Sequence, residues 1–339
     1  MDRCLGSSRF SSASRKILQF HDIPVARDTP NLLTQTNIPN NFECRNDPSI
    51  FADLFAPELH LMPELPEVET MVRGIRTDCV GRRIDRTLFP PCPCRPLQIS
   101  PSRRTLIKQT EGRTITRIRR LAKRIVLELD SGQLIVVEPR MTGLMLITDP
   151  PTRKHRRICF ELSPARKKAH SLEFWDRRGL GTISLLNPQQ LVQLESRLGK
   201  DALDLLVEDW ISILARTEQE IKVVLMDQSR VAGIGNLYAS EILHEARISP
   251  FLAASGVSRR QIQNLANATN RILQEAIAYE GSTLADGTYR NALNKDGGYQ
   301  NHHLVYKRAD TLCSSCGKTT IQRTVQAQRA TFFCARCQR

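Results

Sequence analysis

The stretch RIVLELDSGQLIVV, residues 124–137, decides the fold of the first half of the chain. Apolar and polar side chains alternate before the turn letters DSG, and the apolar pattern returns after them, as is typical of an antiparallel hairpin. A period of two extends from about residue 82 to 186, and it predicts further strands at residues 158–162, 171–175 and 181–186. The sequence therefore predicts a β-sandwich or barrel.

The segments on either side of this region have a helical period. Before it, Val68, Met71, Val72 and Ile75 recur at the spacing of one helix face and predict a short helix over residues 66–76. After it, helical patterns dominate from about residue 189 to 280. We predict an α+β chain with four parts: a leader at 1–61 that is disordered or a mis-assigned start, a β-sandwich domain with its leading helix at 62–188, a helical domain at 189–301 that ends in a Gly- and Asn-rich loop, and a cysteine hairpin at 302–339.

The positive charge of the chain is concentrated after residue 61. The formal net charge is +14, and residues 1–61 hold six Lys or Arg against seven Asp or Glu, which leaves +15 on residues 62–339. Such a basic body is typical of a protein that neutralises phosphates, although charge alone also fits an ordinary basic protein. No apolar run is long enough to span a membrane and the N-terminus does not resemble a signal peptide, so we expect no membrane partner and a cytoplasmic location.

Four of the ten cysteines form one constellation near the C-terminus. Cys313 and Cys316 make one pair, Cys334 and Cys337 make the other, and 17 residues separate the pairs. This spacing predicts one zinc ion held by four thiolates, and because protein fills all four positions we expect its role to be structural. The intervening residues are predicted to form a hairpin with its tip at 326–329.

A shorter cysteine motif lies in a proline-rich loop, where Cys92 and Cys94 flank a proline. The sequence offers no second pair of ligands for it. We interpret these two cysteines as structural residues without a metal.

Four motifs along the chain carry a family resemblance. They read MPELPEVET at residues 62–70, LAK at 121–123, VAGIGNLYASE at 231–241 and AQRATFFC at 327–334. The first alone would predict only the start of a helix, with proline and carboxylates in its opening turn. Together, in this order, they closely resemble bacterial formamidopyrimidine-DNA glycosylase over residues 62–339. The LPEVE form favours this enzyme over its relative endonuclease VIII, which prefers oxidised pyrimidines.

The resemblance implies a bifunctional DNA glycosylase and AP lyase with four catalytic residues. Pro63 is the expected nucleophile, because an α-amino group has a pKa near ~7.7–8.0 against ~10.4 for lysine and is therefore far more often neutral at pH 7. Glu64 resembles the general acid and requires a pKa raised by burial or by neighbouring carboxylates. Lys123 matches the proton donor in β-elimination, although it also fits a phosphate-binding cation. Arg329 matches the arginine of δ-elimination and phosphate clamping.

The same resemblance implies a helix–two-turn–helix that binds DNA at residues 221–246. Asn236 is expected to cap its second helix and to hold a phosphate together with the free N–H groups, although an ordinary capped helix is the alternative. Lys222 is a further candidate phosphate contact. Gly233 and Gly235 are expected where β-carbons would block the backbone.

Further DNA contacts follow by alignment with the family. Met141 is expected to fill the gap left by the flipped base, with Arg178 reading the orphaned cytosine and Leu180 beside it. The loop at 285–301 would close over the extruded purine. His155 matches another DNA contact, although a solvated loop histidine is an almost equal interpretation.

Two departures from the family pattern stand out. Residues 138–141 read EPRM where His-x-Gly-Met is usual, and Leu180 replaces an aromatic residue, so stacking on the neighbouring base is lost. The larger departure is the leader, because an internal Pro63 is a tertiary amide without a usable lone pair. We expect synthesis to start at Met62, which is then removed; the alternatives are that a protease exposes Pro63 or that the protein is not this enzyme.

The expected function is base-excision repair of double-stranded DNA that contains 8-oxoguanine or formamidopyrimidines, by a monomer associated with the nucleoid. Two alternatives remain open at this stage. One is a non-catalytic damaged-DNA binder with a blocked Pro63. The other keeps the fold and takes oxidised pyrimidines as its substrate.

Overall fold

The β-rich part of the molecule consists of two sheets. The computed structural model describes residues 62–284, 287 and 289–339, so the expected leader at 1–61 lies outside the described residues. One sheet has the order β1 (Ile84–Leu88), β7 (Arg156–Leu162), β8 (Ser171–Asp176) and β6 (Gly143–Leu146). The other has the order β2 (Gln98–Ser100), β9 (Thr182–Leu186), β5 (Leu134–Glu138), β4 (Arg124–Leu129) and β3 (Ile115–Leu121), and only β2 runs parallel to its neighbour.

One hydrophobic core joins the two sheets, which confirms the predicted β-sandwich. Leu127 and Ile135 from the five-stranded sheet share a buried cluster with Phe160 and Phe174 from the four-stranded sheet. The hairpin predicted from residues 124–137 is formed by β4 and β5, in which Val126 pairs with Val136.

The outer face of this hairpin is also covered. Val126 and Val136 belong to a separate buried cluster that includes Leu191 of α4 (Pro188–Glu195). Helix α4, which the sequence assigned to the helical domain, therefore packs on the five-stranded sheet.

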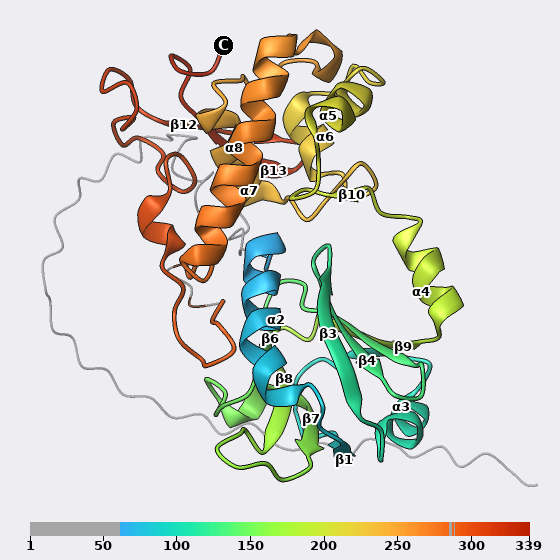
Figure 1. Cartoon of the computed structure of the whole chain (residues 1–339). Coiled ribbons are helices and arrows are strands. Elements are labelled where there is room, and N and C mark those ends of the chain that lie inside the picture. Colours follow the sequence, from blue (N-terminus) through green and yellow to red (C-terminus); the bar gives the residue numbers. More distant parts are fainter. Residues whose placement is uncertain (1–61, 285–286, 288) are drawn as a thin grey trace, which may run out of the picture. The chain divides into compact units, whose positions relative to one another are not determined.

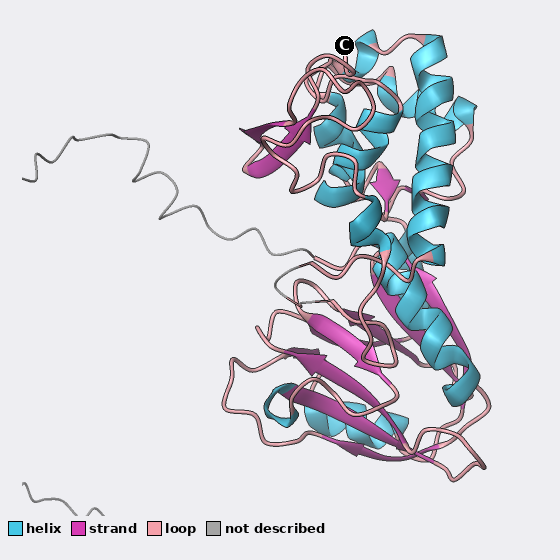
Figure 2. Cartoon of the chain, turned by 90° about the vertical axis from the view of Figure 1, so that its left-hand side faces the viewer, coloured by secondary structure: helices cyan, strands magenta, loops and turns pink. Residues whose placement is uncertain are grey.

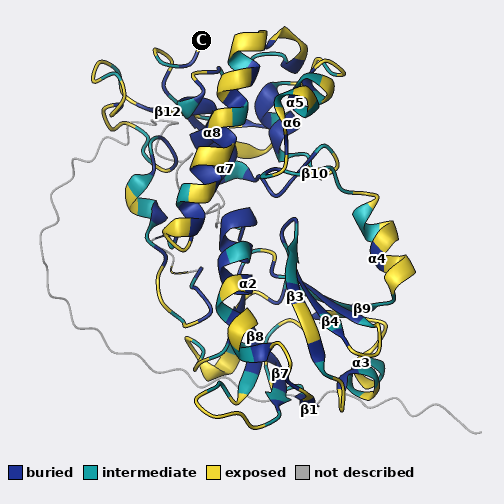
Figure 3. Ribbon diagram, in the orientation of Figure 1, coloured by how far each residue is buried: buried dark blue, intermediate teal, exposed yellow. Residues whose placement is uncertain are grey.

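Helix α2 (Leu65–Cys79) connects the β-rich and helical parts (Figure 1). It is longer than the helix predicted over residues 66–76, and Val68 and Ile75 enter the core of the sandwich as expected. Its first residue, Leu65, belongs to the core of the helical part instead, and the Leu65 amide donates to the Gly233 carbonyl at 3.1 Å. The residues just before and within the first turn of α2 therefore lie between the two cores, where they are buried (Figure 3).

The period of two predicted between residues 82 and 186 does not hold throughout, because the short 3-10 helix Arg153–His155 and one α-helix lie within this range. Helix α3 (Arg103–Thr110) interrupts this region, and the Ser102 hydroxyl caps it by accepting a hydrogen bond from the Thr105 amide at 3.1 Å. Ser102 is the N-cap residue of this helix, but the helix has only eight residues, so its sequence pattern is too short to predict it with the periodicity alone.

The remaining helices gather in the second half of the described chain, as predicted (Figure 2). They are α5 (Val207–Leu214), α6 (Ile221–Met226), α7 (Asn236–Glu245) and α8 (Arg259–Ala278). The predicted C-terminal hairpin is formed by β12 (Gln322–Gln326) and β13 (Arg329–Phe333). Among the described residues, no helix combines the length and apolar character needed to cross a membrane.

Candidate active site

The four motifs, which are far apart in the sequence, meet at one cavity of about 220 Å³. Its lining includes Glu64, Lys123, Asn236 and Arg329, one residue from each motif. Met62 also lines the cavity, and Pro63, placed between Met62 and Glu64, is buried beside it. The expected nucleophile and its expected helpers are thus brought to the same place.

Glu64 is the residue that precedes α2, and its carboxylate reaches the N-terminus of α7. It accepts hydrogen bonds from the Gly235 amide at 2.5 Å and the Leu237 amide at 3.0 Å. Burial raises the pKa of Glu64, while the charge of Lys123 and the backbone hydrogen bonds oppose this rise. A β-carbon at residue 235 would lie 2.4 Å from the Glu64 carboxyl carbon, so glycine is required there, as predicted.

Asn236 does not cap α7, which corrects the sequence prediction. Gly235 is the N-cap residue and Asn236 is the first residue of the helix. Its side chain turns instead to the hairpin, where Nδ2 donates to the Ala330 carbonyl at 3.0 Å. The carboxylate of Glu64 accepts from the Gly235 and Leu237 amides at this helix end, so these two N–H groups are not free to bind a phosphate.

Lys222 is also placed otherwise than expected. Only 1% of the residue is exposed, and Nζ donates to Asn236 Oδ1 at 2.7 Å, Ala330 O at 3.0 Å and Thr331 Oγ1 at 2.7 Å. An ammonium group has three donors, so none remains for a phosphate, and the predicted phosphate contact is wrong. Burial lowers the pKa of Lys222 to about 8. The residue instead fixes the hairpin that carries Arg329 against α7.

Lys123 and Arg329 are each presented by a tight hairpin. Lys123 lies in the two-residue turn between β3 and β4, where Ala122 adopts a φ of 53°. Arg329 follows the two-residue turn of Ala327 and Gln328, with φ values of 47° and 60°, at the predicted hairpin tip. Lys123 is 9% exposed, and burial lowers its pKa while Glu64 opposes this shift.

Glu67 lies directly behind Glu64 and ties the two cores together. Its carboxylate accepts from the Glu64 amide at 3.0 Å, the Tyr238 hydroxyl at 2.7 Å and the Ser282 amide at 3.0 Å. Burial raises the pKa of Glu67 to about 7, and the negative charge of Glu64 adds to this rise. These contacts link the first turn of α2 to Tyr238 of α7 and to Ser282.

We expect the raised pKa of Glu67 to produce a pH-dependent stability. The unfolded carboxyl loses its proton near pH 4.5 and the folded one near pH 7, so the free energy of unfolding falls as pH rises through this window. Relative to Glu67→Gln, the wild-type chain should lose about 3 kcal/mol between pH 4.5 and 7.5. Urea unfolding of both proteins across that range measures the difference, and parallel pH curves would contradict the assignment.

A buried aspartate organises the two loops that carry the other predicted DNA contacts. Asp176, which is fully buried, accepts from the Thr142 hydroxyl, from the Arg178 amide at 3.1 Å and from the Gly181 amide at 2.8 Å. It therefore places Met141 and Arg178 on adjoining loops, with the neighbouring Leu180 half-buried. These three residues do not line the cavity.

Asp176 was not singled out in the sequence, although it begins the motif that contains Arg178. We expect Asp176→Asn to leave at least one buried donor without an acceptor and to cost about 1–3 kcal/mol of stability. A lower urea midpoint with an unchanged slope measures this loss, and the exposed Asp149→Asn is the matched control. Equal midpoints for the two variants would show that Asp176 does not hold these loops.

The loop at 285–301, which is expected to close over the extruded purine, is anchored in its described part. Residues 285, 286 and 288 lie outside the described residues. Tyr289 is 1% exposed, and the carbonyl of Ala292 accepts from the Ile147 amide at 3.1 Å. Ala292 also packs so closely on α2 that a β-carbon at Gly74 would come within 2.5 Å of its Cβ. Burial of Tyr289, Ala292 and Tyr299 thus anchors this part of the loop, while Leu293 between them is exposed.

His155 lies away from the cavity, in the short 3-10 helix Arg153–His155. Its ring meets the edge of Trp175 with centroids 5.4 Å apart, and its Nδ1 lies 3.3 Å from the sulfur of Cys94. Only Nε2 is left to meet a phosphate.

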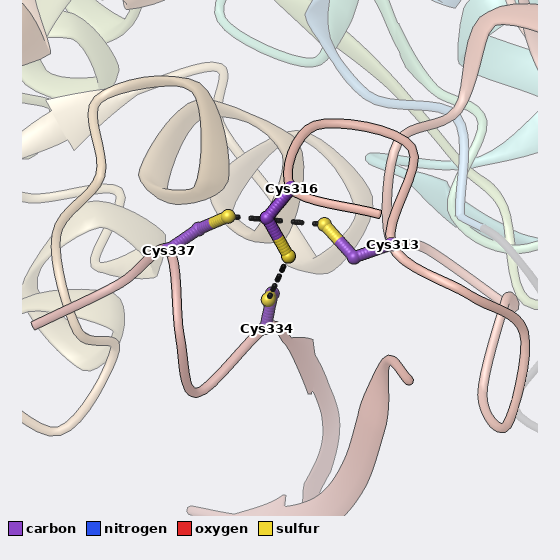
Figure 4. A group of neighbouring side chains, drawn as sticks. All are labelled: Cys313, Cys316, Cys334 and Cys337. Carbon is purple, nitrogen blue, oxygen red and sulfur yellow. Dashed lines mark hydrogen bonds between the residues drawn. The ribbon is translucent and has the colours of Figure 1, made fainter. Parts of the chain in front are cut away.

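The four C-terminal cysteines have the geometry of a zinc centre (Figure 4). Cys313 and Cys337 have their sulfurs 3.8 Å apart, and so do Cys316 and Cys334. A tetrahedral zinc ion with Zn–S bonds of about 2.3 Å requires sulfurs roughly 3.8 Å apart, so the residues fit the metal. His244 Nε2, at 3.5 Å from the Cys313 sulfur, supports it from outside. The cluster holds one structural zinc.

Comparison with known proteins gives a consistent result. Three family models match successive parts of the chain: the formamidopyrimidine-DNA glycosylase N-terminal domain at 62–183, the formamidopyrimidine-DNA glycosylase H2TH domain at 198–287, and the zinc finger found in FPG and IleRS at 312–339. A formamidopyrimidine-DNA glycosylase of Chloroflexus aurantiacus is 37% identical over 279 residues, covering 82% of this chain and 98% of the relative.

Solved structures resemble the same region. The MutM (Fpg) protein of Thermus thermophilus superposes with a TM-score of 0.71 at 31% identity, covering 81% of this chain and 98% of that one. A Lactococcus lactis Fpg mutant in complex with DNA containing Fapy-dG gives a TM-score of 0.72 at 30% identity, with coverage of 82% and 100%.

Proposed function

Because this chain belongs to the formamidopyrimidine-DNA glycosylase family, we propose that it excises oxidised purines from double-stranded DNA and then cleaves the strand. The observation that carries this proposal is the convergence of Glu64, Lys123 and Arg329 on one cavity beside Pro63. A carboxylic acid, an ammonium and a guanidinium supply the proton transfers and the phosphate clamp that such a reaction needs.

The first step requires the free amine of Pro63. Its nitrogen lone pair attacks C1′ of the damaged nucleoside, and the bond to the base breaks as Glu64 donates its proton to the ring oxygen or to the base. Burial favours the protonated form of Glu64, which suits this donor role. Because proline is a secondary amine, loss of its own proton and ring opening give an iminium ion that keeps its positive charge.

That charge acidifies the hydrogen on C2′ and so promotes loss of the 3′ phosphate by β-elimination. Lys123 stands beside Glu64 with a pKa lowered by burial, so it exchanges a proton more readily near neutral pH than an exposed lysine does. Arg329 reaches the same cavity from the hairpin tip and would hold a phosphate during a second, δ-elimination.

We assign the remaining contacts to the duplex around the lesion. Met141 fills the gap left by the extruded base, Arg178 faces the orphaned cytosine and Leu180 supports it. Neutralising phosphates makes binding strongly dependent on salt, as the +15 charge of residues 62–339 leads us to expect. The protein would act as a monomer on nucleoid DNA.

The proposal is tested with a chain that begins at Pro63 and three duplexes. These carry 8-oxoguanine opposite cytosine, a formamidopyrimidine, or an oxidised pyrimidine. We expect base release and strand cleavage on the first two to be faster than on the third. Faster cleavage of the pyrimidine duplex would favour the substrate of endonuclease VIII, and binding without any cleavage would favour a non-catalytic binder.

A further inference from the structure

A second group of potential metal ligands lies in the β-rich part of the molecule, far along the chain from the four-cysteine zinc centre. Cys92 and Cys94 come from the loop before β2, and His155 comes from the turn before β7. Their ligand atoms all lie within 4.8 Å of one another. Among the described residues, the four C-terminal cysteines form the one other group of this kind that includes a cysteine or histidine. We propose that these three residues form a second zinc site.

The distances suit a tetrahedral ion. With Zn–S bonds of about 2.3 Å and Zn–N bonds of about 2.0–2.1 Å, neighbouring ligand atoms are roughly 3.5–3.8 Å apart. Cys94 Sγ and His155 Nδ1 are 3.3 Å apart, and Cys92 Sγ lies within 4.8 Å of both. Three protein ligands leave one position for water or for an external group.

His155 is held in the orientation that the metal needs. Its ring meets Trp175 edge to face at an interplanar angle of 88°, and the Trp175 indole nitrogen is fixed by donating to the Thr152 carbonyl at 2.8 Å. Nδ1 thereby points to Cys94 rather than to solvent. Such outer contacts orient a ligating histidine before the metal arrives.

The cysteine loop is fixed as well. Arg157 donates to the Arg95 carbonyl at 2.9 Å and to the Asp176 carbonyl at 2.7 Å, so it connects this loop with the turn that leads to Arg178. Gly179 packs closely on the Arg95 carbonyl, since a β-carbon at residue 179 would lie 2.4 Å from its oxygen. The ligands therefore come from two anchored segments.

Several positively charged side chains lie near the site. Lys154, Arg157 and Arg177 all act electrostatically on His155. Zinc displaces the two thiol protons, and two thiolates with neutral imidazole leave the bound site without net charge. A bare dication would be repelled here, whereas a thiolate-neutralised ion is not. Cysteine and histidine together select zinc over magnesium or calcium, which prefer oxygen.

The zinc site would also affect DNA binding. This effect rests on the proposed function, whereas the zinc site itself does not. Zinc on Nδ1 fixes the proton of His155 on Nε2, which can then donate to a phosphate. The metal would at the same time stiffen the connection through Arg157 to the turn of Arg178.

Zinc content tests the site without any activity assay. We would load the full 339-residue chain with zinc under reducing conditions, remove the excess by gel filtration and measure zinc per chain. The wild-type chain should retain about two zinc ions, and the Cys92→Ser/Cys94→Ser double variant about one. Cys159→Ser, a cysteine outside both groups, is the matched control and should retain two.

A second variant keeps the test decisive if the double variant does not fold. His155→Ala should weaken the second zinc by at least about tenfold in chelator competition and leave the first unchanged, since even supporting contacts are worth that much. One zinc in the wild-type chain, two in the double variant, or a Cys92–Cys94 disulfide in the reduced, loaded protein would each overturn the proposal.

Discussion

Replacing Glu64 with glutamine should abolish base excision while leaving cleavage at a preformed abasic site. The amide keeps the size of the side chain but has no acidic proton for the leaving base, and general acid catalysis contributes about 10²–10⁴-fold to rate. An abasic sugar has already lost its base, so the steps that follow require Pro63 and Lys123 but not this proton.

Single-turnover rates on a lesion duplex and on an abasic duplex separate these two effects. Glu161→Gln, which changes a half-exposed carboxylate on β7, is the control and should match the wild-type chain on both. If Glu64→Gln lost both activities equally, a structural role at the start of α7 would explain the result and the general-acid assignment would fail.

Replacing Cys316 with serine should release the structural zinc and weaken DNA binding. Structural zinc sites contribute directly to folding, and this one holds the end of β13, whose other end begins with Arg329. Loss of the charged contact from Arg329 should cost about 1.5–3 kcal/mol, or roughly 10- to 150-fold in affinity for a lesion duplex.

Zinc analysis and a binding titration at fixed salt measure both parts of this prediction. Cys159→Ser again serves as the control, because that cysteine lies in the sheet and outside the zinc centre. Retention of full zinc and full affinity by Cys316→Ser would contradict the claim that the metal positions the hairpin.

Local patterns predicted much of the fold. The hairpin at 124–137, the helix that begins at Leu65 and the cysteine spacing depend on residues close in sequence, so periodicity and turn residues were sufficient. The tip at Arg329 could be placed for the same reason. The residues that determine each of these features lie within one hairpin, one helix or one pair of cysteine motifs.

Contacts between distant segments could not be predicted in this way. A lysine such as Lys222 can bind a phosphate, and the sequence alone does not show otherwise. In the structure its three donors bind one acceptor on α7 and two on β13, and those on β13 are more than a hundred residues away in sequence. Cys94 and His155 are 61 residues apart, which is why the cysteine loop had no visible ligand partner in the sequence.

The structure also explains how Glu138 and Arg140, which depart from the family pattern, are accommodated before Met141. Arg140 stands where the family has glycine and adopts a φ of 56°, the left-handed region that glycine favours. Glu138, which replaces the family's histidine, pairs with Arg124 at 3.2 Å and with Arg140 at 3.1 Å on the rim of the cavity. These ion pairs hold the strained turn before Met141.

The role of Pro63 as the nucleophile is tested most directly by borohydride trapping on a duplex with one oxidised purine. Reduction of the iminium would join protein and DNA covalently. The chain that begins at Pro63 should give this complex, and the chain of residues 1–339, in which Met62 blocks the nitrogen, should give none. Trapping by an intact 339-residue chain, or no trapping by the chain that begins at Pro63, would contradict the account.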